Sequence, residues 1–102
     1  MTLEEAAAAL EECRRKIDEV DRRITDLLNE RARIVEVVGD IKQQVEMPVY
    51  EPKREDLVYL NIASHNGGPL RADALKRVYE RIIDEMRTLQ RDRMARKAGE
   101  SR

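Results

Sequence analysis

The feature that most constrains this chain is an apolar seam running from Leu10 to Val45. The stretch holds no proline and one glycine, Gly39. Its apolar residues return every three or four positions, which places them on one stripe of a long helix. One position of the repeat carries Leu10, Ile17, Ile24, Val38 and Val45, and the other carries Cys13, Val20, Leu27, Ile34 and Ile41. The pattern predicts a helix that packs lengthwise against partner helices.

One residue interrupts this seam. Arg31 occupies the repeat position between Ile24 and Val38. A guanidinium in an apolar seam is costly unless its charge and its donors are matched. Two interpretations stay open on the pattern alone: a polar residue that sets the register of a coiled coil, or a cation that binds a ligand.

The composition favours an all-α fold. The chain has 102 residues, the size of one domain. Aromatic residues make up 3% of it, with no Phe or Trp, so aliphatic side chains must fill the core. The 20 basic and 21 acidic residues nearly cancel, which gives no overall field that would indicate nucleic-acid binding. Charges this dense and balanced are typical of solvated helix faces.

The first helix is expected to be very long. Thr2 and Glu5 have the spacing of a capping box, and the restriction that Pro48 places on the preceding residue ends the helix near Val45. Such a helix measures about 60 Å at 1.5 Å per residue. The remaining sequence is too short to cover its stripe. We therefore expect three helices per chain and an intertwined homodimer in which the first helix crosses between chains.

The rest of the chain predicts two more helices. Pro52 suits the first turn of the second helix, and the turn-forming run at 64–69 ends it. The third helix is expected from about Arg71 to Arg93. Residues 1–94 then form the domain, and residues 95–102, small and polar, form a tail expected to fray.

The expected location is the cytoplasm. Cys13 is the single cysteine, which excludes an intrachain disulfide and suits a reducing compartment; its seam position predicts burial. The N-terminal stretch lacks the basic start of a secretory signal, and no apolar run approaches the ~20 residues of a membrane span.

Several polar residues share the face of Arg31 or can reach it. Lys42 lies eleven residues further on, which is about 16 Å and three turns, so the two cations can grip opposite ends of a small dianion. Arg14 lies seventeen residues earlier, about 25 Å away, and can reach that region only from a second, antiparallel chain. Taken singly, Lys42 and Arg14 also fit solvated surface positions.

The full set of polar positions resembles the all-helical chorismate mutase family. The order is Arg14, Arg31, Lys42, Pro48-Val49, Arg54-Glu55 and Gln90, with the segments Asn29-Glu30-Arg31, Val38-Gly39-Asp40-Ile41-Lys42 and Lys53-Arg54-Glu55. The resemblance covers about Leu10 to Gln90. The break Asn66-Gly67-Gly68-Pro69 and the Leu89-Gln90 ending look most like members fused to, or associated with, deoxy-heptulosonate-phosphate (DAHP) synthase.

The resemblance implies an intramolecular rearrangement of chorismate to prephenate, with no metal and no cofactor. Arg31 and Arg14 of the partner subunit would bind the two carboxylates, with Arg54 in support. Lys42 and Gln90 would donate to the ether oxygen as its negative charge develops. Glu55 would accept from the ring hydroxyl, with help from the backbone at Glu51.

Two positions depart from the family pattern, and three rival functions stay open. Glu51 stands where a shorter Asp is also seen, and Met86 stands where a small polar residue can contact the substrate. An isochorismate-pyruvate lyase of the same fold would share the arginines, Lys42 and Gln90. A regulatory module that binds chorismate or prephenate and docks on DAHP synthase would keep the cationic pocket. A purely structural dimer predicts that Arg31→Leu is stabilising.

Overall fold

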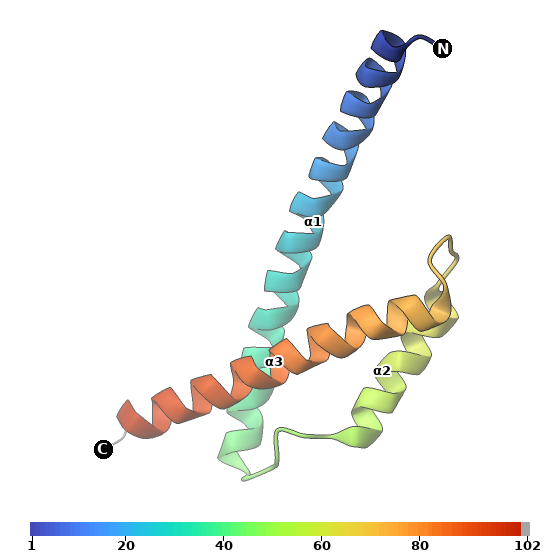
Figure 1. Cartoon of the computed structure of the whole chain (residues 1–102). Helices are drawn as coiled ribbons and strands as arrows, with labels where there is room; N and C mark the ends of the chain where they lie inside the picture. Colours follow the sequence, from blue (N-terminus) through green and yellow to red (C-terminus); the bar gives the residue numbers. More distant parts are fainter. Residues whose placement is uncertain (101–102) are drawn as a thin grey trace. The chain divides into compact units, whose positions relative to one another are not determined.

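The computed structural model describes residues 1–100 and contains three helices and no strand within them (Figure 1). The helices are α1 (Leu3–Gln44), α2 (Pro52–His65) and α3 (Ala72–Glu100). The predicted all-α class with a very long first helix is confirmed. The chain divides into two compact units, Met1–Arg33 and Ile34–Arg102, so the division falls inside α1.

The start of α1 follows the predicted cap. The backbone N–H of Glu5 donates to Thr2 Oγ1 at 3.0 Å, which satisfies one of the free amides of the first turn. Glu4 and Glu5 also place negative charge at the positive end of the helix dipole.

The end of α1 is a turn that the sequence did not indicate. The N–H of Met47 donates to the carbonyl of Lys42 at 2.8 Å, and Glu46 has a φ of 56°. Together these form a Schellman-type end, in which a residue in the left-handed region follows the last helical turn. The helix stops at Gln44, one residue before the predicted Val45, because this turn reverses the chain ahead of Pro48.

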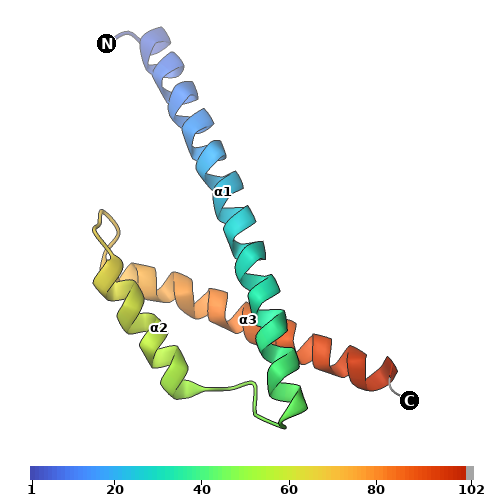
Figure 2. The ribbon, with the colours of Figure 1, turned by 180° about the vertical axis from the view of Figure 1, so that it is seen from behind.

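Within the second unit, the last turns of α1 and the whole of α2 and α3 lie together. Figures 1 and 2 show α3 passing across the C-terminal turns of α1, with α2 beside the other end of α3. Pro52 is the first residue of α2, as predicted. The α2–α3 loop is closed by Asn66, whose Nδ2 donates to the Leu70 carbonyl at 2.9 Å and whose Oδ1 accepts from Gly68 N–H at 3.0 Å.

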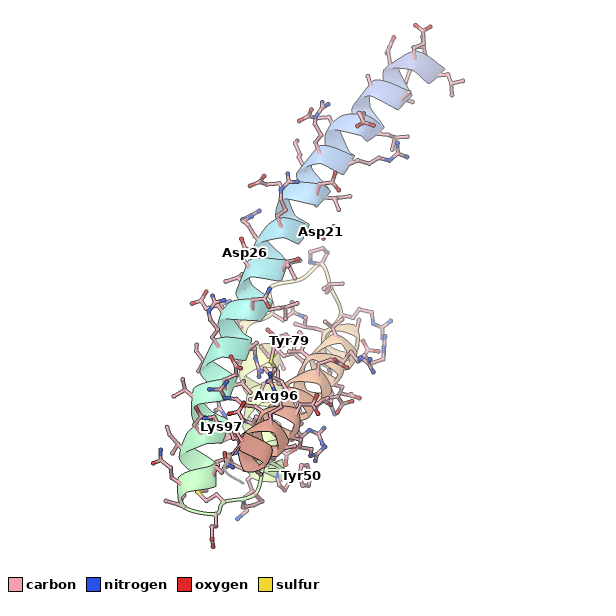
Figure 3. All side chains as sticks on the ribbon, turned by 90° about the vertical axis from the view of Figure 1, so that its left-hand side faces the viewer. Asp21, Asp26, Tyr50, Tyr79, Arg96 and Lys97 are labelled. Carbon is pink, nitrogen blue, oxygen red and sulfur yellow. The ribbon has the colours of Figure 1, made fainter. Side chains whose placement is uncertain are left out.

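The predicted end of α3 near Arg93 is wrong, because the helix continues to Glu100. A frayed tail was expected over residues 95–102; of these, 95–100 are helical, and Ser101 and Arg102 lie outside the described residues. Lys97 explains part of the difference, since its Nζ lies 2.8 Å from Asp40 Oδ1 on α1 (Figure 3). Composition alone could not show that this polar segment has a packing partner.

The seam of α1 is uncovered in the single chain. Leu27 is 61% exposed, and the seam residues from Leu10 to Val45 that carry large apolar side chains are similarly accessible. Cys13, for which burial was predicted, is also exposed. Among residues 1–100, Ile83 is the one apolar side chain that counts as buried. A single copy therefore has a very small core. None of the described helices is both long and apolar enough to cross a membrane.

Candidate active site

Lys42 is a buried cation in the last turn of α1. Only 7% of the residue is exposed, and its Nζ donates to the Val49 carbonyl at 3.1 Å. The same nitrogen lies 2.5 Å from Glu51 Oε1. An ammonium group carries three donors, so these two contacts leave a third N–H for a ligand. The structure thus brings together two of the sequence-predicted site residues, Lys42 and Glu51.

Gln90 is the second buried polar side chain of this unit. It lies on α3, is 6% exposed, and its Nε2 donates to the Val35 carbonyl of α1 at 3.2 Å. Its side chain packs over Gly39, where an added Cβ would stand 3.3 Å from Gln90 Cγ. Gly39 is three residues before Lys42, so the amide of Gln90 lies within about one helical turn of the Lys42 backbone.

Glu55 lies in the first turn of α2 with a side chain that is 17% exposed. Its Oε2 is 3.4 Å from Nε of Arg87 on α3, whose side chain is 26% exposed. Arg87 also pairs with Asp84, and its guanidinium stacks 5.4 Å from the ring centre of Tyr50. The sequence analysis did not single out Arg87, because nothing in the spacing indicates which α3 residue meets Glu55.

A polar cluster fixes α3 to the end of α1. Arg93 binds Asp40 with two hydrogen bonds, Nε to Oδ1 at 3.0 Å and Nη2 to Oδ2 at 3.1 Å, and reaches Glu36 at 3.1 Å. Hydrogen bonds from Arg93 and Lys97 lower the pKa of Asp40 to about 2. The hydrogen bond to Asp40 raises the pKa of Arg93 in turn. Sequence reasoning missed this cluster, although pairs four residues apart on both helices were its signal.

The other predicted site residues are more accessible. Arg54 is exposed in the first turn of α2, and Met86 is half-buried on α3. In the first unit Arg14 is exposed and Arg31 is half-buried. These two arginines are seventeen residues apart on one helix, about 25 Å, so a single chain does not bring them together.

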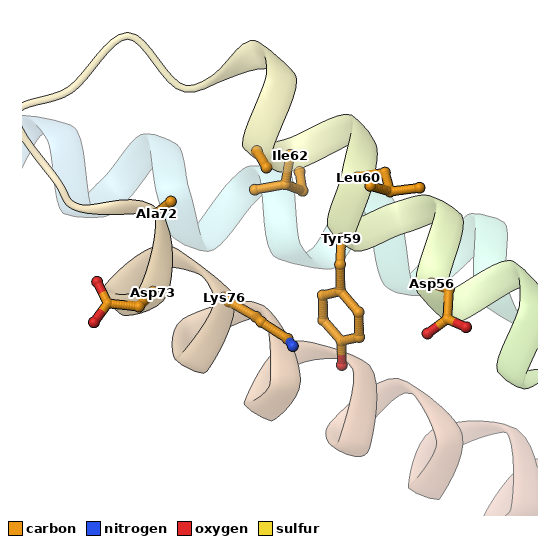
Figure 4. Close-up of a pocket in the computed structure, with 8 residues that line it drawn as sticks. Asp56, Tyr59, Leu60, Ile62, Ala72, Asp73 and Lys76 are labelled. Atoms are coloured by element: carbon orange, nitrogen blue, oxygen red, sulfur yellow. The ribbon is translucent and has the colours of Figure 1, made fainter.

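A separate hollow of about 480 Å³ lies between α2 and the start of α3 (Figure 4). Lys76 Nζ stands 5.3 Å from the ring centre of Tyr59, and burial, with the nearby Glu55 carboxylate, raises the pKa of the Tyr59 hydroxyl. The hollow is lined by Asp56, Tyr59, Leu60, Ile62, Ala63, Ala72, Asp73 and Lys76. None of these is a predicted site residue. We therefore place the candidate site at Lys42 and Gln90.

The chemistry available at this site is hydrogen-bond donation inside a partly dry environment. An ammonium and an amide, both buried and both held by backbone carbonyls, can donate to an oxygen that gains negative charge. In the part of the chain that is described, no group of three or more His, Cys, Asp or Glu side chains is placed to hold a metal ion.

Comparison with known proteins gives a consistent result. The model of the family described as chorismate mutase type II matches residues 13–91. The chain is 35% identical over 86 residues to a bifunctional chorismate mutase/prephenate dehydratase of Aquifex aeolicus, covering 80% of this chain and 24% of that protein. It is 42% identical over 50 residues to a chorismate mutase of Methanocaldococcus jannaschii, covering 49% of this chain and 50% of that protein. The chain thus spans a quarter to a half of these curated relatives.

Solved structures agree with this family. A chorismate mutase from Helicobacter pylori, in complex with prephenate, has a TM-score of 0.81 and 30% identity, covering 86% of this chain and 96% of that chain. A chorismate mutase from Thermus thermophilus (form II) has a TM-score of 0.80 and 28% identity, covering 81% of this chain and 94% of that chain. Since the family model spans well over half of the sequence, the chain belongs to the chorismate mutase type II family.

Proposed function

We propose that this chain catalyses the intramolecular rearrangement of chorismate to prephenate. The observation that carries the proposal is the pair of buried donors, Lys42 and Gln90, held by the Val49 carbonyl of the α1–α2 connection and by the Val35 carbonyl of α1. Family membership and the likeness to a chorismate mutase solved with prephenate support it.

The reaction asks for positioning and charge stabilisation. The ether C–O bond breaks while a C–C bond forms within one molecule, and no atom leaves. As the C–O bond lengthens, negative charge grows on the ether oxygen. The third N–H of Lys42 and an N–H of Gln90 donate to that oxygen, and burial strengthens both hydrogen bonds.

The remaining predicted residues bind the rest of the substrate. We assign the two carboxylates to Arg31 and to Arg14 of the partner subunit, with Arg54 in support. Glu55 accepts from the ring hydroxyl, next to the backbone of Glu51. Met86 offers no hydrogen-bond donor where a small polar residue can stand, so substrate affinity is expected to be lower without loss of the ether-oxygen donors.

The working form in this proposal is an intertwined homodimer. Two observations support it: the seam of α1 is exposed in one chain, and Arg14 lies about 25 Å from Arg31 along the same helix. A second antiparallel α1 covers the seam and supplies the missing arginine.

The proposal has three further parts. We assign the mutase domain to residues 1–94 and place the protein in the cytoplasm, where its single thiol suits a reducing environment. We also propose association with DAHP synthase, supported by the loop at 66–69; the Aquifex relative is instead joined to prephenate dehydratase. Adding DAHP synthase to the purified chain should raise its turnover, and an unchanged rate contradicts that association.

The test of the activity is loss of chorismate absorbance on adding purified protein, with the product identified. Formation of prephenate supports the proposal, whereas release of pyruvate from isochorismate identifies the lyase. Lys42→Ala should lower kcat by about 10²–10³, while Lys53→Ala, an exposed lysine on α2, should leave it unchanged. Chorismate binding without turnover, with and without DAHP synthase, leaves the regulatory module as the function.

A further inference from the structure

Arg87 is a positively charged residue that the proposed mechanism does not use, yet it contacts a residue that the mechanism needs. We propose that Arg87 is a positioning residue that orients the Glu55 carboxylate toward the ring hydroxyl of the substrate. The inference rests on the proposed function and adds a residue outside the polar pattern by which the sequence resembles the family.

The position of Arg87 joins three segments of the second unit. It extends from α3 to Glu55 on α2, with 3.4 Å between Nε and Oε2, and its guanidinium lies 5.4 Å from the ring centre of Tyr50 in the α1–α2 connection. Asp84, one turn earlier on α3, pairs with the Nη2 end of the same guanidinium. The stacking on Tyr50 and the Asp84 pair hold the guanidinium next to Glu55.

Nε of Arg87 lies beside Glu55 Oε2 without completing a hydrogen bond. In the part of the chain that is described, Nε of Arg87 is the buried side-chain nitrogen that lacks a hydrogen-bond acceptor. The 3.4 Å separation to Glu55 is long for a charge-assisted hydrogen bond. Hydrogen bonds of a catalytic site are often long before the substrate binds and shorten in the complex. A small movement of Glu55 satisfies Nε–H while its other oxygen accepts from the ring hydroxyl.

The experiment compares two substrates, chorismate and an analogue that lacks the ring hydroxyl. Arg87→Met removes the charge and keeps an unbranched stem, and Arg87→Lys keeps the charge without the Nε fork. With chorismate, Arg87→Met should lower kcat by about tenfold to a hundredfold, with a smaller change in KM, and Arg87→Lys should recover part of the loss. With the analogue, all three proteins should turn over at similar rates.

The matched control is Arg81→Met on the same helix, where Arg81 forms an exposed pair with Glu85 at 3.0 Å. Arg81→Met should convert both substrates at the wild-type rate. In a Glu55→Gln background, Arg87→Met should cause little further loss, since Arg87 acts through Glu55.

Equal losses on both substrates, or additive losses with Glu55→Gln, would overturn the inference. Thermal unfolding checks that each variant folds. If Arg87→Met does not fold, the turnover of the two substrates by Arg87→Lys tests the inference in its place. A wild-type protein that does not convert chorismate removes the proposed function itself. An active wild type with an unaffected Arg87→Met removes only the role of Arg87.

Discussion

At the scale of single residues, Gly39 leaves room beside the backbone of α1 for the polar side chain of Gln90. Glycine inside a helix costs about 1 kcal/mol relative to alanine. At this position Gln90 lies over the bare Cα, and a Cβ would approach Gln90 Cγ to 3.3 Å. The glycine therefore lets α3 bring its amide close to the backbone of α1.

Gly39→Ala should separate stability from activity. The gain in helix propensity, about 1 kcal/mol, is offset by the displacement of a buried, hydrogen-bonded Gln90, so the free energy of unfolding should change by less than about 1 kcal/mol. Turnover should fall about tenfold or more, because a few tenths of an ångström move the amide donor. Urea unfolding and chorismate turnover measure the two effects.

Gly99→Ala is the control for that substitution, since nothing lies within 4 Å of the added Cβ and only helix propensity changes. Its activity should equal that of the wild type. A fully active Gly39→Ala enzyme would show that the amide position of Gln90 is not critical.

Candidate residues could be identified from the sequence where a residue type is rare for its place. An arginine in an apolar seam is visible as such an exception, and Gln90, which the resemblance to a family singled out, is buried in the structure. Arg87 gave no such sign, because one more charged residue does not stand out on a helix that is rich in charge until a tertiary neighbour is known. Its contact with Glu55 depends on how two helices pack.

At the scale of the elements, the end of α1 holds local strain. Glu46 adopts a φ of 56°, a left-handed conformation that costs a residue with a Cβ about 1–2 kcal/mol. Sequence reasoning placed the helix end within one residue by means of Pro48, but it could not identify this turn, because glutamate is not the usual residue there.

Glu46→Gly should raise the free energy of unfolding by about 0.5–1 kcal/mol, because glycine relieves the left-handed strain at the cost of a more flexible unfolded chain. Glu46→Ala keeps the Cβ and should give no such gain. Chemical denaturation of the two variants makes the comparison, and an equal gain in both would point to the lost carboxylate instead.

The Asp40–Arg93 cluster should make the attachment of α3 dependent on pH. The pKa of Asp40 falls from 3.8 to about 2 in the folded protein, so the unfolded chain binds a proton first as the pH drops. The stabilisation is therefore complete above about pH 4 and is lost between about pH 4 and pH 2. The wild type should melt at a higher temperature than Asp40→Asn above that window, and the difference between the two melting temperatures should shrink as the pH falls through it.

Asp26→Asn, on an exposed part of α1, serves as the control. The difference in melting temperature between this variant and the wild type should stay constant over the same pH window. A difference between wild type and Asp40→Asn that stays constant down to pH 2 would contradict the assignment. The same cluster explains why the helical part of residues 95–100 escaped prediction: its partners lie on α1, far away in sequence.

At the scale of the whole molecule, the exposed seam dominates. Its apolar side chains alternate with charged faces along α1, and the core of a single chain is too small to be a stable alternative. The helix length could be predicted from the unbroken seam, and the proposal of a second chain followed from it. How two copies of α1 are arranged depends on contacts that one chain does not contain.

Leu27→Glu should convert the proposed dimer into a monomer of low stability, because a carboxylate replaces a seam leucine that a second chain would bury. Light scattering after size exclusion measures the mass. Arg22→Glu, an exposed residue on the side of the helix opposite the seam, should leave the mass at twice that of one chain. A wild-type protein that is monomeric at high concentration would contradict the dimer.

Mixing two inactive variants tests whether Arg14 is shared between chains. Arg14→Ala and Lys42→Ala should each be inactive as homodimers. After unfolding and refolding together in equal amounts, half of the dimers are mixed and each of these regains one intact site, so about a quarter of the wild-type activity should return. No recovery would mean that Arg14 serves the site of its own chain, or none.

The exposed seam of α1 also affects how fast the protein can fold. In the proposed dimer, a chain that finishes its helices before it meets a copy keeps Leu27 and its neighbours in water, and the final step of folding is then an encounter between two molecules. Its rate grows with the concentration of newly made chains. For the proposed dimer, abundance sets not only how many copies are present but also how quickly each copy reaches its native state.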